Sequence, residues 1–162
     1  MSRTALLPLF QWCDQTAIGV WIRESTWMFA LLEVVHVLAL ALLLGTAVAL
    51  NLRLMNAGLV RQPMSVLSRN LRPWMQAGLF VILVSGVLLF LSEAMKCYGN
   101  DAFWFKMTSL ALALGFHFTV FSTVSASDDE ARFSPMRRRI VACVSLLLWL
   151  SVGAGGRAIG FV

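Results

Sequence analysis

The 162-residue chain is 59% hydrophobic and only 13% charged, which excludes an ordinary soluble globular domain and indicates an integral membrane protein. Its formal charge of +5 does not indicate nucleic-acid binding, because the arginines cluster at the ends of apolar runs. The length fits one membrane domain, residues 1–162, in which each span needs ~20 apolar residues.

The first 26 residues are expected to form an interfacial amphipathic helix. Their apolar stretch ALLPLF is too short for a cleaved signal, and charged residues such as Asp14 interrupt any longer run. Trp12 and Trp21 suit the headgroup region of a membrane. Four spans follow, at about 27–50, 74–92, 103–124 and 138–155. The predicted fold is therefore all-α, a four-helix transmembrane bundle with an N-terminal interfacial helix.

Two prolines and a glycine-rich stretch belong to the later segments. Pro73 is expected to open the second span, where its missing N–H does no harm, and Pro135 to interrupt the last loop. The sequence GAGGR near the C-terminus lacks the strand and helix of a nucleotide-binding loop, so its glycines are expected to permit close helix packing. No nucleophile and base stand at usable spacing, which argues against a hydrolase.

Ionisable residues within the spans are the main functional signal. The first span contains Glu33 and His36, although such a group near the middle of a membrane helix costs roughly 2.5–3.5 kcal/mol. The other histidine of the chain, His117, lies in the third span. Counted inward from the nearest external charges, both histidines lie roughly 16–20 Å deep. The first and third helices of an up-down bundle are diagonal, so the two imidazoles are predicted to be the axial ligands of one haem b.

The surroundings of the histidines suit a planar cofactor. One face of the third span carries small side chains and a terminal charge at intervals of three or four: Lys106, Ser109, Ala113 and His117. Lys106 and Arg157 are expected near the haem propionates, unless they are ordinary interface charges. Glu33 is expected to orient the His36 ring or to carry a proton, unless it is a neutral acid bonded to another helix.

The predicted function is electron transfer by a haem b protein that exchanges electrons with quinol or with an external redox protein. A copper-binding transporter or chaperone is one alternative, with His36, His117 and methionines as ligands, because thioether sulfur suits Cu(I). The methionines near the external halves of the spans are Met28, Met75, Met95 and Met107. The other alternative is a non-catalytic scaffold subunit of a membrane complex, in which the histidines join helices by hydrogen bonds.

The three cysteines divide by position. Cys143 lies within the fourth span and is expected to pack as a small apolar residue. Cys13 and Cys97 are expected on the oxidising side of a bacterial inner membrane, where disulfides persist. A Cys13–Cys97 disulfide would join the N-terminal segment to the loop between the second and third spans.

Several short motifs occur in a fixed order along most of the chain. They are E-x-x-H at 33–36, Gly45, N-L-R-L at 51–54, P-W-x-x-x-G at 73–78, S-G-x-x-x-F at 85–90, F-x-x-K at 103–106 and W-x6-G-R-x-I-x-F at 149–161. In these motifs the chain resembles an uncharacterised family of small four-span bacterial inner-membrane proteins, with Asn51 where that family usually has aspartate. The resemblance implies the fold and the membrane location. More distantly, the layout is similar to copper-resistance membrane proteins and small b-type cytochromes.

Basic residues predict the orientation in the membrane. Eight of the 13 lysines and arginines fall in the two loops that follow the first and third spans. The positive-inside rule therefore places these loops in the cytoplasm and both termini in the periplasm. A reporter fused after Val162 should report the periplasm, and one inserted near Asp129 should report the cytoplasm. The reverse pattern would also remove Lys106 and Arg157 from the external side.

Overall fold

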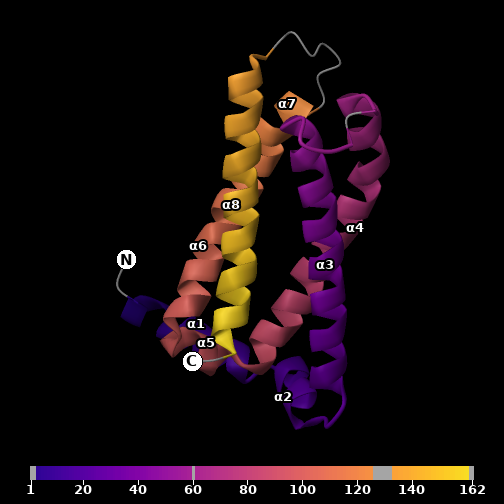
Figure 1. The fold of residues 1–162 in the computed structure, drawn as a ribbon. Coiled ribbons are helices and arrows are strands. Elements are labelled where there is room, and N and C mark those ends of the chain that lie inside the picture. Colours follow the sequence, from indigo (N-terminus) through magenta and orange to yellow (C-terminus); the bar gives the residue numbers. More distant parts are fainter. Residues whose placement is uncertain (1–2, 60, 126–132, 161–162) are drawn as a thin grey trace.

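The computed structural model describes residues 3–59, 61–125 and 133–160, which form helices joined by short turns. Four helical segments are long and apolar enough to cross a membrane. They are α3 (Met28–Leu54), α4 (Met64–Ser92), the continuous segment α6–η2–α7 (Asp101–Ser125) and α8 (Pro135–Ile159). The all-α four-helix bundle predicted from the sequence is confirmed (Figure 1).

The helices alternate in direction, so both chain ends lie at the same end of the bundle (Figure 1). We call this end, where α3 begins and α8 ends, the terminal end. The opposite end, where α3 ends and α8 begins, is the loop end. This up-down arrangement requires only short connections between neighbouring helices.

The four long helices pack as two pairs. α3 lies along α4 and α6 lies along α8, and the pairs meet mainly where α3 contacts α8. α3 and α6 therefore lie on a diagonal, as the sequence analysis expected. The main core contains large buried side chains from all four segments, among them Leu43, Leu54, Met75, Phe121 and Trp149.

Two prolines occupy positions that differ from the predictions. α4 begins at Met64, well before the predicted start of its span, so Pro73 lies inside the helix instead of opening it. Pro135 opens α8 instead of interrupting the loop, and the Ser134 side chain caps that helix. Hydropathy located only the apolar part of each helix, whereas both helices extend into polar sequence at the loop end.

The N-terminal segment is broken into short helices and is not the single helix predicted. It forms η1 (Arg3–Leu6), α1 (Leu7–Asp14) and α2 (Ala17–Glu24). The break lies at Thr16, which has an extended backbone and whose hydroxyl caps α2 by accepting from the Gly19 amide.

Arg23 and Gly19 hold α2 against the bundle. The Arg23 guanidinium donates to the Asp14 carboxylate and to the Ser92 carbonyl, both at 3.0 Å. A Cβ at Gly19 would lie 2.3 Å from the Leu91 carbonyl oxygen, so only glycine permits this approach of α2 to α4.

A second, smaller core lies at the terminal end, where α1 packs against α5 (Ala94–Gly99). It is built around the ring of Phe10 and includes Cys13 and Cys97. Both cysteines are buried free thiols, so the predicted disulfide is not formed in this structure. Burial, with a smaller contribution from the Glu93 carboxylate, raises the pKa of the Cys97 thiol to about 11.

The raised pKa predicts an unreactive thiol at Cys97. At pH 8 its thiolate fraction should be roughly 100-fold below that of an unperturbed thiol, so maleimide labelling of the native protein should be correspondingly slow. Time-resolved labelling followed by mass spectrometry measures this rate, and the same protein unfolded in SDS is the control. Recovery of a linked Cys13–Cys97 peptide under non-reducing conditions would contradict the free thiols.

Candidate functional site

The His36 ring is held by a hydrogen bond to α4. Its Nδ1 lies 2.8 Å from Ser85 Oγ, and the Ser85 hydroxyl is 2.6 Å from the carbonyl oxygen of Val81. A serine hydroxyl has one hydrogen, and here it is donated to that carbonyl. Ser85 Oγ therefore accepts a hydrogen bond from His36 Nδ1–H. The remaining ring nitrogen, Nε2, carries a free lone pair.

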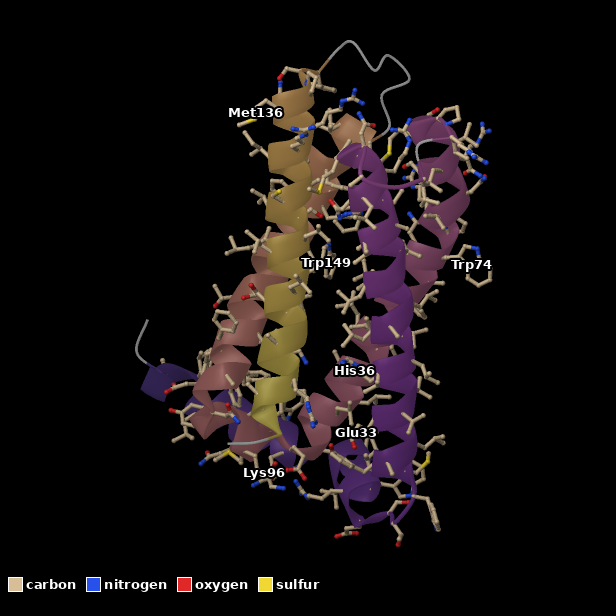
Figure 2. All side chains as sticks on the ribbon, in the orientation of Figure 1. Glu33, His36, Trp74, Lys96, Met136 and Trp149 are labelled. Atoms are coloured by element: carbon tan, nitrogen blue, oxygen red, sulfur yellow. The ribbon has the colours of Figure 1, made fainter. Side chains whose placement is uncertain are left out.

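This tautomer is the one that metal-binding histidines adopt when they bind through Nε2. The sequence analysis expected Glu33 to orient the ring, but the partner at Nδ1 is Ser85. Glu33 lies closer to the terminal end than His36 (Figure 2), and its side chain is exposed. No residue in the described part of the chain forms a hydrogen bond with His36 Nε2.

Gly86, the neighbour of Ser85, makes room for the imidazole. A Cβ at this position would lie 3.3 Å from His36 Cε1, closer than nine in ten real Cβ contacts. The Ser85-Gly86 pair thus fixes the ring by one hydrogen bond and by shape. Both residues were missed as site residues, although the S-G-x-x-x-F motif contains them.

Lys106 of α6 (Asp101–Phe116) enters the bundle beneath two glycines of α8. A Cβ at Gly155 would lie 3.0 Å from Lys106 Cβ, and one at Gly156 would lie 3.4 Å from Lys106 Nζ. The expectation that these glycines permit close helix packing is therefore confirmed. Their absence of side chains lets the lysine stem lie along α8.

The Lys106 ammonium group has no counterion among the residues that the structure describes. Within residues 3–59, 61–125 and 133–160 it forms no hydrogen bond or ion pair, although it lies within electrostatic range of His36. It is about 7.5 Å along α6 from the first residue, and His36 is about 12 Å along α3. A half-buried cation and an open imidazole nitrogen thus occupy the same half of the bundle. Arg157 lies in the last turn of α8, at the same end.

His117 has a different environment, in the π-helical segment η2 (His117–Phe121) that continues α6. Its ring stacks on Phe121, with ring centroids 5.3 Å apart, and approaches Trp149 at 6.3 Å. Its Nδ1 is buried and has no hydrogen-bond partner among the described residues. π-Helical turns within α-helices are frequent at functional sites.

The structure does not bring the two histidines together. At 1.5 Å per residue His117 is about 24 Å along its helical segment, twice as far as His36 along α3. Figure 2 shows Trp149, whose ring neighbours His117, closer to the loop end than His36. The sequence analysis counted depth from charges at unequal distances from the helix starts, which made the two levels appear equal.

Among the described residues, the structure does not bring together a set of ligands for the copper alternative. Met75 is buried in the main core, whereas Met95 and Met107 are exposed. The described residues contain no group of three or more histidine, cysteine or acidic side chains able to hold a metal ion.

Comparison with known proteins identifies a family but no characterised relative. No curated protein and no solved structure matches the chain. The family of unknown function DUF6644 matches residues 9–162. Since the match covers nearly the whole sequence, the chain belongs to this family, in agreement with the uncharacterised family that the motifs indicated.

Proposed function

We propose that the protein is a membrane electron-transfer protein that binds one haem b through His36. The observation that carries the proposal is the hydrogen bond from His36 Nδ1 to Ser85, because it leaves Nε2 as a free lone pair inside a membrane-spanning bundle. Haem iron takes imidazole nitrogen as an axial ligand, and bound haem would supply one-electron oxidation and reduction.

The charge distribution supports an anionic cofactor beside His36. Lys106 is half buried in a membrane helix and unpaired within the described chain, an arrangement that costs free energy without an anion. The two carboxylates of a haem are anions of suitable charge. Lys106 and Arg157 would bind these propionates, and the stem of Lys106 is already positioned by Gly155 and Gly156.

The proposal departs from the sequence-based one in its ligand set. His117 lies beside Phe121 and Trp149 and not beside His36, so His36 is the one histidine that would hold the haem. Glu33, exposed and one turn from His36, is the group that we propose exchanges protons with the surroundings of the site.

We further infer that the terminal end faces the periplasm of a bacterial inner membrane. The arginines at the loop end support this orientation, because Arg53 lies in the last turn of α3 and Arg137 and Arg138 lie in the first turn of α8. The His36 site would then lie in the outer half of the bilayer, within reach of an external redox protein.

The first test uses the absorption spectrum of the protein purified from cells with ample haem. The wild-type protein should carry about one haem per chain, and His36→Ala should lose it because the axial ligand is gone. His117→Ala should retain the haem at wild-type stoichiometry. A colourless wild-type protein that also fails to bind haem on titration would overturn the proposal, and metal analysis would then separate copper binding from a scaffold role.

The second test distinguishes the residue that would bind the iron, His36, from residues that would support binding, Ser85 and Lys106. Ser85→Ala removes the acceptor at His36 Nδ1 and should weaken haem affinity by about 10–100-fold without abolishing binding, as the loss of a supporting partner does at other metal sites. Lys106→Met keeps the apolar stem but removes the charge, and we expect it to weaken binding as well. Affinities come from haem titration. Thr119→Ala is the matched control, because its hydroxyl bonds only to its own helix.

A further inference from the structure

An apolar cavity of about 320 Å³ opens between α3 and α8, away from the His36 site. Its lining includes Gly45, Ala47 and Val48 of α3 and Leu146, Trp149 and Leu150 of α8. Ala47 and Trp149 are buried. Val48 and Leu150 are exposed on the surface that a bilayer would cover. A Cβ added at Gly45 would meet no atom within 4 Å, so the cavity has unfilled space that opens toward lipid.

The chemistry of the lining selects a hydrocarbon occupant. All of the lining residues are apolar. The described core has two orphan polar atoms, Asn51 Oδ1 and His117 Nδ1, which are buried without a hydrogen-bond partner, and both belong to residues outside the lining. A polar group placed in this cavity would lack a partner, which costs free energy. The part of a ligand that fits here is therefore an apolar chain, and the apolar chains available in a bilayer are those of its lipids.

An arginine lies on the same face of α8 as the cavity, nearer the loop end. Arg139 precedes Leu146 by seven residues and Leu150 by eleven, spacings that place the three side chains on one face of a helix. At 1.5 Å per residue the two leucines lie roughly 10–17 Å from Arg139 along the helix axis. Half of the hydrocarbon core of a bilayer is about 15 Å thick. One acyl chain can therefore reach the cavity from a head group at Arg139.

The charge of Arg139 is available to a ligand. Its side chain is exposed and forms no hydrogen bond or ion pair with another residue of the described chain. The neighbouring Arg137 differs, because its guanidinium lies over the Phe133 ring at 4.8 Å. The acidic residues that the structure describes all lie at the terminal end, and they are Asp14, Glu24, Glu33, Glu93 and Asp101. Side chains on a helix point toward its N-terminus, which for α8 is the loop end and the membrane surface.

We propose that the cavity and Arg139 form a binding site for one anionic phospholipid of the leaflet at the loop end. The Arg139 guanidinium donates hydrogen bonds to the phosphate, and one acyl chain runs along α8 into the cavity beside Gly45. A zwitterionic head group fits less well, because its amine brings a second positive charge to the arginine. Since α3 and α8 belong to different helix pairs, the lipid joins the two pairs. The site does not involve His36 and is independent of the proposed function.

The test is native mass spectrometry of the purified protein titrated with phosphatidylglycerol or with phosphatidylcholine of the same acyl chains. The wild-type protein should bind its first phosphatidylglycerol more tightly than phosphatidylcholine. Arg139→Gln should weaken that binding by about 5-fold, the effect of one arginine on attraction to an anionic lipid surface, and should leave phosphatidylcholine binding unchanged. Arg72→Gln is the matched control, because Arg72 is also exposed and unpartnered among the described residues but lies on α4, outside the lining.

A second pair of variants tests the cavity. Gly45→Leu should weaken binding of both lipids, since its side chain would fill the cavity without disturbing a neighbour. Gly115→Leu is the control for this substitution, because its Cβ position is equally open but lies on α6. Equal affinity of the wild type for the two lipids would overturn the proposal. So would equal losses in Arg139→Gln and Arg72→Gln, or equal binding by Gly45→Leu and Gly115→Leu.

Photocrosslinking in lipid nanodiscs locates the acyl chain. Phosphatidylglycerol with a diazirine in one chain should label residues 44–48 and 146–150 more strongly than phosphatidylcholine with the same chain does, and Arg139→Gln should remove the difference. Equal labelling of these residues by the two lipids would contradict the site. A lipid-free dimer that Gly45→Leu prevents from forming would show that a second copy of the chain fills the cavity, and would also overturn the proposal.

Discussion

The structure depends on one constraint, which is that no water is available inside a bilayer to satisfy a polar group. Most hydroxyls within the described helices obey it by bonding to a carbonyl one turn earlier, as Thr46, Ser85 and Thr119 do. The groups that do not obey it are few and concentrated. Among the described residues, Lys106 has no anionic partner at the terminal end, and Asn51 Oδ1 and His117 Nδ1 have no hydrogen-bond partner closer to the loop end. Within the described helices, Lys106, Asn51 and His117 are thus polar side chains that are buried or half-buried and have a group without a partner.

The glycines of the spans are of two kinds: some lie where helices are in close contact, and others border open space. Gly78 and Gly155 sit where helices approach most closely, and a Cβ there would lie 3.4 Å from the Ala39 carbonyl oxygen or 3.0 Å from Lys106 Cβ. At Gly86 the group that a Cβ would crowd is a side chain, the His36 ring. Gly45 has neither reason, since nothing lies within reach of its missing side chain. A helix interior prefers alanine to glycine by about 1 kcal/mol, and neither Gly45 nor Gly115 has a close contact that a Cβ would block.

The sequence was sufficient for the fold class, the four spans and the diagonal relation of α3 and α6, because apolar length and up-down connectivity determine them. It was insufficient for the site. Counting residues from the flanking charges placed His36 and His117 at the same depth in the membrane. The two helices begin at different distances from those charges, so the depths differ. It also favoured Glu33 over Ser85 as the partner of His36, because i,i+3 spacing is visible in a sequence whereas a contact from another helix is not. The two orphan atoms have no sequence signature at all.

The arrangement of the helices gives the two histidines different surroundings. The pairs α3–α4 and α6–α8 meet chiefly along α3 and α8. Trp149 lies on the seam, with His117 as one neighbour and the apolar cavity as another. His36 instead draws its support from α4, through Ser85 and Gly86. The contacts of His36 thus come from α4, whereas those of His117 come from its own helical segment and from α8, so a change beside one histidine need not disturb the other.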